Sequence, residues 1–272
     1  MYIRISLTKG VILLRIQIKF AFQGSLRVPI HHNPLIHGLI YHSIRDPDYR
    51  DQLHNAGFSY ENRQFRMFCY SPLQGRYIVQ EQHLVFTSPV SFLFSTHDER
   101  LIRELTSSLF TRDQIMIGTQ AVKLLSIQQI DQEISDNMVV RMLTPVTAYS
   151  TFILNNKKKT FYFTPKDEEF NQQVRENAIK KYIAIYDRQP DSKHLSLTPV
   201  DYKQLRSKTV MFKETFIKGW TGSFYLQGDP ELIQIVYDVG LSAKNSNGLG
   251  MFEVVRHIQG GMNQTCSMPS LR

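Results

Sequence analysis

The order of strand and helix patterns along this 272-residue chain predicts an α+β fold of two βαββαβ units in tandem. This is the tandem ferredoxin-like (RRM-like) arrangement. Two observations carry the prediction. Strand–helix–strand patterns recur in both halves of the chain, and patterns typical of hairpins lie between them. The length also allows two domains, each large enough to bury its own core.

The first unit opens with alternating apolar and polar residues over 14–22, which is the period of a half-buried strand. Asn33 and Pro34 then predict a helix start, with Asn33 as the cap and Pro34 at the first helical position. Asp46-Pro47 predicts the break after that helix. The remaining elements expected in this half are a short helix over 49–54, strands over 65–70, 75–79 and 83–94, a helix over 98–110, and strands near 113–117 and 119–127.

The second unit repeats this order without repeating the sequence. We expect the boundary near 133–135, so that residues 1–133 form the first domain, 134–260 the second, and 261–272 a flexible tail without periodicity. The elements expected here are strands over 138–143, 159–163 and 251–255, helices over 167–186 and 230–239, and a hairpin that joins 208–218 to 222–226.

Composition limits the class of protein. Hydrophobic residues make up 42% and aromatic residues 11%, which excludes a disordered chain. The 32 basic and 24 acidic residues give a formal charge of +8, which favours an anionic partner. Cys69 and Cys266 cannot form a disulfide framework, and without a CxxC pair a cysteine zinc site is excluded. This cysteine usage is typical of a reducing cytoplasm, where we expect the protein. With no run of 18 apolar residues, we expect no segment that spans a membrane.

The most informative segment is a glycine-rich loop over 240–250, where three glycines surround Lys244 and small polar residues. Such backbones can approach phosphate closely. Dinucleotide-binding loops and P-loops follow a strand and precede a helix. This loop instead follows a predicted helix and precedes a predicted strand. The residues themselves leave two alternatives open, a phosphate-binding loop or a helix cap at Gly240 with a turn at Gly248.

The loop ends in Lys-Asn-Ser-x-Gly-hydrophobic-Gly-hydrophobic, and in this it resembles the C-terminal signature of CRISPR-associated repeat RNA-processing endoribonucleases of the RAMP superfamily. Ser242 stands where a second glycine is usual. The segments 37–44 and 143–146 are similar to that family's N-terminal helix and to the start of its second domain. The resemblance implies metal-independent cleavage of precursor CRISPR RNA within its repeats. Attack by the RNA 2′-hydroxyl would leave a 2′,3′-cyclic phosphate and a 5′-hydroxyl, with no cofactor.

The resemblance also implies a catalytic histidine in the first domain, helped by a tyrosine and a lysine. His54 matches the catalytic histidine and Tyr41 the helper tyrosine, whereas Arg66 stands at the lysine position. Arginine keeps the charge but stays protonated, so we expect an electrostatic role for Arg66. His42 and His37 are substitutes for His54, because the catalytic position shifts within the family.

Each of these residues also has an ordinary structural interpretation. Tyr41 could be a core tyrosine, His54 a helix-end histidine favoured by the helix dipole, and Arg66 a solvated strand residue. We expect no metal site, because no histidine lies three or four residues from another on one helix face.

The residues expected to bind RNA belong to the glycine-rich loop and to the predicted hairpin of the second domain. They are Lys244, Asn245, Gly248 and Gly250 in the loop, and Lys208, Lys213 and Lys218 on or beside the hairpin. Scattered basic residues suit an RNA read by its shape and backbone. The lysine run 157–159 could do the same, or could form a solvated turn.

The sequence leaves alternatives of different classes open. The chain could be a non-catalytic RAMP-fold subunit that binds repeat RNA within a CRISPR interference complex, or a ferredoxin-like domain pair that binds a small molecule. The expected partner is CRISPR repeat RNA, with a homodimer or other interference subunits as further expectations. A histidine that faces an RNA-sized basic cleft together with Tyr41 would favour the nuclease.

Overall fold

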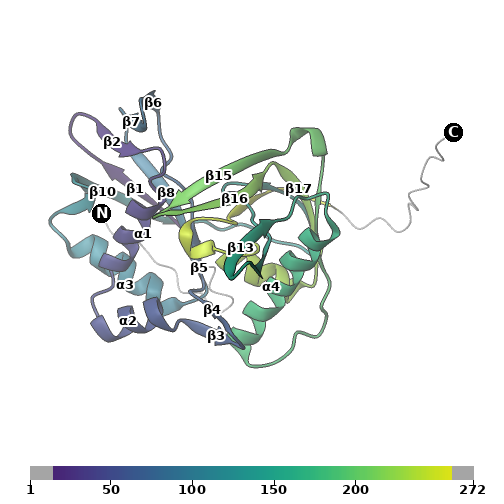
Figure 1. Cartoon of the computed structure of the whole chain (residues 1–272). Helices are drawn as coiled ribbons and strands as arrows, with labels where there is room; N and C mark the ends of the chain where they lie inside the picture. Colours follow the sequence, from purple (N-terminus) through teal and green to yellow (C-terminus); the bar gives the residue numbers. More distant parts are fainter. Residues whose placement is uncertain (1–14, 259–272) are drawn as a thin grey trace.

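The computed structural model describes residues 15–258, and the predicted tail lies outside the described residues. Two antiparallel sheets with their helices lie side by side, one from each half of the chain (Figure 1). The tandem ferredoxin-like fold predicted from the sequence is confirmed by the strand orders that follow.

The first sheet has the order β5-β8-β1-β10-β9. Its strands are β1 (Arg15–Ala21), β5 (Phe68–Tyr70), β8 (Val90–Thr96), β9 (Ile115–Ile117) and β10 (Gln120–Gln129). The helices of this half are α1 (Asn33–His42), α2 (Pro47–Asn55) and α3 (Glu99–Thr111). With α1 and α3 as the crossovers, the strands β1, β5, β8 and β10 have the βαββαβ order. The core of this unit joins the buried faces of β1 and β8 to the apolar sides of α1 and α3.

The second sheet has the order β14-β17-β11-β18, which is the same arrangement. Its strands are β11 (Asn137–Met142), β14 (Leu195–Pro199), β17 (Ser223–Gly228) and β18 (Phe252–His257). Its crossover helices are α4 (Glu168–Tyr186) and α5 (Pro230–Val239). Asp229 caps α5 by accepting a hydrogen bond from the Glu231 amide, and Pro230 occupies the first turn. A second core forms between α4, α5 and this sheet.

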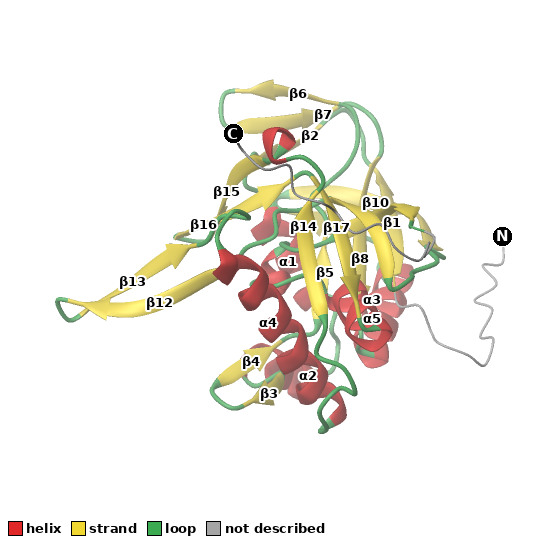
Figure 2. Cartoon of the chain, turned by 90° about the vertical axis from the view of Figure 1, so that its right-hand side faces the viewer, coloured by secondary structure: helices red, strands yellow, loops and turns green. Residues whose placement is uncertain are grey.

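Smaller elements are inserted into both units (Figure 2). The first unit carries the hairpin β3 (Phe58–Tyr60) with β4 (Arg63–Phe65), and a sheet of β2 (Leu26–Pro29), β6 (Tyr77–Gln80) and β7 (His83–Phe86). The second unit carries the hairpins β12 (Tyr149–Leu154) with β13 (Lys157–Tyr162), and β15 (Arg206–Phe212) with β16 (Thr215–Thr221). Two short 3₁₀ turns complete it, η1 (Tyr202–Gln204) and η2 (Asn245–Asn247).

Several predicted elements differ in the structure. The strand expected over 83–94 is two strands, because Pro89, just before β8, has no amide hydrogen to donate to a ladder. The hairpin expected between 208–218 and 222–226 is instead β15–β16. The chain turns at Lys213, which adopts a φ of +53° without a glycine to mark the turn. The strands β12 and β14 were not predicted.

The capping role expected of Asn33 is wrong. Asn33 is the first residue of α1, His32 occupies the cap position, and no side chain caps the helix. The Asn33 amide instead donates to the backbone oxygens of Asn247 at 2.9 Å and Gly248 at 3.3 Å. A residue that looks like a local helix signal therefore joins the first domain to the glycine-rich loop of the second.

Buried polar contacts hold the two domains together. The guanidinium of Arg15, only 2% exposed, donates to the backbone oxygens of Phe252 and Tyr237 and lies 3.7 Å from the centroid of the Tyr237 ring. The ring of His97 lies 3.5 Å from the buried carboxylate of Asp238.

The last strand of the first sheet and the first strand of the second are close in the sequence, since β10 ends at Gln129 and β11 begins at Asn137. The boundary near 133–135 and the exact domain ranges stay a prediction.

Replacing Arg15 should weaken this interface. We expect Arg15→Met to lower the free energy of unfolding by about 2–3 kcal/mol, since two buried carbonyl groups lose a charged donor and the Tyr237 oxygen keeps only the Ser95 hydroxyl at 3.4 Å. Lys19→Met is the matched control, because Lys19 is exposed on the same strand. That variant should stay within about 0.5 kcal/mol of the wild type in urea denaturation. Equal effects of the two substitutions would contradict the role assigned to Arg15.

Candidate active site

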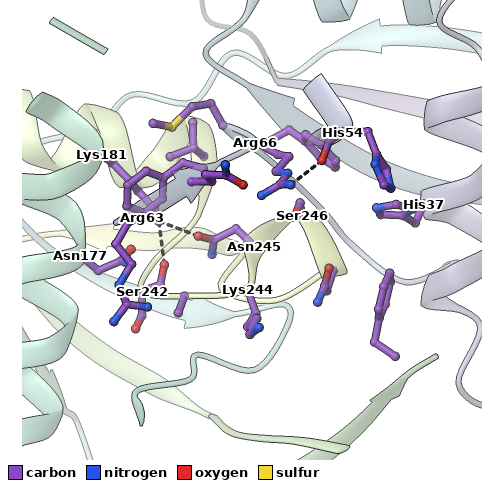
Figure 3. Close-up of a pocket in the computed structure, with 18 of the residues that line it drawn as sticks. His37, His54, Arg63, Arg66, Asn177, Lys181, Ser242, Lys244, Asn245 and Ser246 are labelled. Carbon is purple, nitrogen blue, oxygen red and sulfur yellow. Dashed lines mark hydrogen bonds between the residues drawn. The ribbon is translucent and has the colours of Figure 1, made fainter. Parts of the chain in front are cut away.

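A pocket of about 440 Å³ lies between the two domains. The first domain lines it with α1, α2 and the segment 62–68, and the second with α4, the turn of β15–β16 and the glycine-rich loop. Figure 3 shows His37, His54 and Arg66 at one end and Asn177, Lys181 and Ser242 at the other. Side chains from both domains are therefore needed to form it.

The histidine end of the pocket brings predicted residues together. His37 and Tyr41 lie on successive turns of α1 with their ring centroids 4.6 Å apart. His54, in the last turn of α2, meets the Tyr41 ring edge-on at 5.6 Å. Arg66, which precedes β5, donates from its guanidinium to the backbone oxygen of His54 (Figure 3). The ring of His54 also lies 3.0 Å from the amide oxygen of Asn55.

Burial sets the protonation of two of these groups. It lowers the pKa of His37 to about 4, and the positive charges of Lys213, His54 and Arg66 act in the same direction. The His37 ring is therefore neutral near pH 7 and can accept a proton. Burial raises the pKa of the Tyr41 hydroxyl, although the nearby Arg66 charge opposes this. Tyr41 therefore keeps its proton near pH 7.

Other predicted residues lie elsewhere. His42 is exposed on the opposite side of α1 from His37 and lines a separate hollow with Arg112, whose guanidinium donates to the His42 backbone oxygen. Lys208 and Lys218 lie on β15 and β16 but do not line the pocket. Lys213, at the turn between those two strands, does line it.

The glycine-rich loop is held from inside by a residue that the sequence did not single out. Lys181 of α4 is 3% exposed, and its ammonium donates to the Gly240 and Ser242 backbone oxygens at 2.8 and 2.7 Å and to the Asn245 amide oxygen at 2.6 Å. Burial lowers the pKa of Lys181 to about 7. In its ammonium form the side chain has three protons, one for each of the three acceptors.

A signal for Lys181 was present in the sequence. The residue shares the apolar side of α4 with Val174 and Ala178, where a solvated lysine does not belong. A lysine at such a position indicates a buried acceptor cluster or a functional site. Its partners, however, are two backbone oxygens and one amide, none of which has a sequence pattern.

Asn245 completes the loop and is not free to bind RNA through its side chain. Its amide nitrogen donates to the backbone oxygens of Leu241 at 2.9 Å and Leu249 at 3.0 Å, while its oxygen accepts from Lys181. The residue is 7% exposed. We therefore assign the side chain of Asn245 to the shape of the loop, although the residue lines the pocket, and its expected contact with RNA stays a prediction.

Gly248 and Gly250 also shape the loop and do not line the pocket. A Cβ at Gly250 would lie 2.1 Å from the Leu241 oxygen, and one at Gly248 would lie 2.6 Å from the Asn33 amide nitrogen. Ser242, the position where the resemblance predicts a second glycine, has a φ of +56°, a conformation that favours glycine. Lys244 is the exposed cation of the loop, 5.7 Å from the Tyr149 ring.

The charge of the pocket suits a polyanion. Its described lining contains no carboxylate and five basic residues besides the histidines, namely Arg63, Arg66, Lys181, Lys213 and Lys244.

Over residues 15–258, no three His, Cys, Asp or Glu side chains gather in a group that could hold a metal ion. Within the same range, no helix has the length and apolar character needed to cross a membrane.

Comparisons with known proteins agree with this arrangement. Residues 129–254 match the family described as CRISPR associated protein Cas6, C-terminal. The chain is 23% identical over 248 residues to CRISPR-associated endoribonuclease Cas6 1 of Methanocaldococcus jannaschii, a match that covers 88% of this chain and 91% of the relative. It is 22% identical over 235 residues to CRISPR-associated endoribonuclease Cas6 of Pyrococcus furiosus, covering 85% and 84%.

Solved structures show the same fold. A Cas6-related protein of Pyrococcus furiosus superposes with a TM-score of 0.77 at 17% identity, covering 89% of this chain and 98% of that one. A RAMP protein described as binding different RNA substrates superposes at 0.75 with 20% identity, covering 89% and 99%. The resemblance predicted from the glycine-rich loop is thereby confirmed, and so is the tandem ferredoxin-like fold.

The loop geometry predicts a large effect of Gly250→Ala. The added Cβ would collide with the Leu241 carbonyl, so the free energy of unfolding should fall by about 3 kcal/mol or more. Gly24→Ala is the matched control, because Gly24 also has a positive φ but a Cβ there meets nothing within 4 Å. Its cost should be about 1 kcal/mol from the backbone alone. Thermal or urea unfolding of both variants checks the difference.

The pKa of His37 predicts a pH dependence of stability. Between about pH 6.5 and 4 the unfolded chain takes up a proton on this ring that the folded protein does not, so His37 lowers stability as the pH falls through that window. We expect His37→Asn to gain stability relative to the wild type between pH 7 and 4.5, measured by urea unfolding. A difference that is constant with pH would contradict the buried, neutral state of His37.

Proposed function

We propose, from its relationship to the Cas6 proteins and from the pocket, that the chain is an endoribonuclease that cleaves precursor CRISPR RNA within its repeats. The single observation that carries the proposal is the histidine end of a basic pocket between two RNA-binding folds. There His37, Tyr41, His54 and Arg66 converge opposite the loop that presents Lys244.

The reaction needs only groups of this kind. The 2′-hydroxyl of the nucleotide before the scissile bond attacks the adjacent phosphorus while a base takes its proton. The bond from phosphorus to the 5′-oxygen breaks, and an acid supplies a proton to that oxygen. Cations stabilise the charge that gathers on the other phosphate oxygens. The products are a 2′,3′-cyclic phosphate and a 5′-hydroxyl, and no metal enters any step.

We assign the principal proton transfer to His54, whose exposed ring borders the pocket. His37 is the second candidate, limited to accepting a proton because its pKa is about 4. Tyr41 keeps its proton and can donate a hydrogen bond to a phosphate oxygen. Arg66 cannot serve as the acid, but its guanidinium can stabilise the negative charge of the transition state.

The second domain supplies the cations that bind the RNA backbone. Lys244 and Lys213 face the pocket from two separate elements, the glycine-rich loop and the turn of β15–β16. Two lysines on different elements fix the position of a phosphate chain without reading its sequence. The partner supported by this arrangement is repeat RNA. The homodimer, the further interference subunits and the cytoplasmic location stay predictions.

Cleavage in EDTA tests the proposal. The wild-type protein should cut a labelled repeat RNA in EDTA, and deoxyribose at the attacking position should abolish cutting. His54→Ala should lower the single-turnover rate by about 10²-fold or more with RNA affinity largely retained. His42→Ala is the matched control, because His42 lies on α1 outside the pocket.

The same experiment separates the alternatives. Tight RNA binding without cleavage by the wild type would overturn the nuclease and leave a structural RNA-binding subunit. A rate lost in His37→Ala but not in His54→Ala would move the proton transfer to His37. A rate lost in His42→Ala would contradict the placement of the site.

A further inference from the structure

The hairpin β12–β13 exposes large apolar side chains that a folded core would normally cover. In its antiparallel register Phe152 pairs with Lys159, Leu154 with Lys157, and Ser150 with Phe161. Paired residues point to the same side of a ladder. One face of the hairpin, here called the aromatic face, therefore carries Ser150, Phe152, Leu154, Lys157, Lys159 and Phe161. Phe152, Leu154 and Phe161 are 46%, 52% and 53% exposed.

Only the base of this hairpin is attached to the rest of the protein. The Tyr162 hydroxyl donates to the Phe216 oxygen at 3.1 Å, and the Trp220 indole donates to the Phe163 oxygen at 3.2 Å. Beyond these contacts the two strands project from the body of the molecule (Figure 2). A protruding hairpin with exposed rings is a sign of an interaction surface, because stability alone does not require those rings.

The charge of the hairpin favours an anionic partner. Residues 149–163 contain Lys157, Lys158 and Lys159 and no aspartate or glutamate. Phe161 is held edge-on by Phe163, with ring centroids 5.2 Å apart, so its position is defined although it is exposed. Flat aromatic rings beside flexible cations are the groups that hold single-stranded nucleic acid, since bases stack on the rings and phosphates meet the cations.

The hairpin is continuous with the pocket. Tyr149, the first residue of β12, lines the pocket, and the Lys244 ammonium lies 5.7 Å from its ring. Tyr149 points to the opposite side of the ladder from the aromatic face, the side of Lys158. An RNA chain that leaves the pocket past Lys244 therefore meets the base of the hairpin first and crosses the edge of the hairpin to reach the aromatic face.

We propose that β12–β13 is an arm that binds unpaired RNA nucleotides next to the cleavage site. Phe152 and Phe161 stack on bases, and Lys157 and Lys159 contact phosphates. The inference rests on the proposed function for the source of the RNA. The arm acts on affinity and not on the chemical step, because none of its four residues lines the pocket.

Binding measurements with an uncleavable repeat RNA, deoxyribose at the attacking position, test the arm. Phe152→Leu/Phe161→Leu keeps apolar side chains but removes the rings and should raise Kd about tenfold. Phe152→Tyr/Phe161→Tyr keeps the rings and should bind like the wild type. Lys157→Ala/Lys159→Ala should lower the magnitude of the slope of log K against log salt by about 1.4. Each phosphate contact to a single strand contributes ~0.7 to that slope, and the variant removes two contacts.

The matched control is Lys193→Ala/Lys203→Ala, which removes the same charge from exposed positions outside the hairpin. It should leave Kd and the salt slope close to the wild type. All variants should melt at the wild-type temperature, because the substituted side chains are exposed. With the ribose RNA at saturation, the arm variants should cleave at the wild-type single-turnover rate.

Shortening the RNA from either end sharpens the test. On an RNA that lacks the nucleotides held by the arm, the wild type should bind no better than the ring-removing variant. Suppose that the wild type cleaves in EDTA but the arm variants bind every RNA as tightly as the wild type. The nuclease then stands, the arm is overturned, and the aromatic face fits a protein partner. The wild type could instead never cleave, while the arm variants bind single-stranded RNA more weakly than the wild type. That result would overturn the nuclease and support the arm.

Discussion

The ammonium group of Lys181 is the contact on which the geometry of the pocket depends. It is buried, and its three hydrogen bonds converge from two backbone oxygens of the glycine-rich loop and the amide of Asn245. Leaving those acceptors without a donor would cost more than the loss of an ordinary surface contact. Because Lys181 lies on α4, the bonds tie the loop to the longest helix of the second domain. The loop then presents Lys244 from a fixed position.

The same loop also fixes the two domains relative to each other. Its outer side accepts hydrogen bonds from the amide of Asn33, at the start of α1, while the Tyr70 hydroxyl donates to the Asn33 oxygen. Gly248 has to be glycine because a Cβ would touch both Asn33 and Tyr70. One helix therefore bears His37 and Tyr41 and also touches the loop that bears Lys244. The spacing between the proton-transfer groups and the phosphate-binding lysine follows from this short chain of contacts.

The sequence predicted the parts of the protein that depend on local patterns. The helix break near Asp46-Pro47, the helix start at Pro230 and the loop between α5 and β18 follow from neighbouring residues, and these are confirmed. The loop also carried the resemblance that led to Tyr41, His54 and Arg66, which the structure brings to one end of the pocket. The rest depends on contacts between distant segments. The turn at Lys213 has no glycine, and the role of Asn33 depends on a carbonyl more than 200 residues away.

Burial and charge act together on the histidine end in a way that matters for an RNA substrate. His37 is kept neutral by burial and by the positive charges of Lys213, His54 and Arg66. The charges of Lys213 and Arg66 oppose protonation of His37 most strongly while the pocket holds no anion. A phosphate placed among them would offset part of their charge and raise the pKa of His37 toward its usual value, because negative charge favours the imidazolium form. Under the proposed function, in which His37 is the second candidate for the proton transfer, substrate binding makes His37 a stronger base when a 2′-hydroxyl proton has to be removed. Before the RNA binds, burial alone is the largest factor that keeps the His37 ring unprotonated.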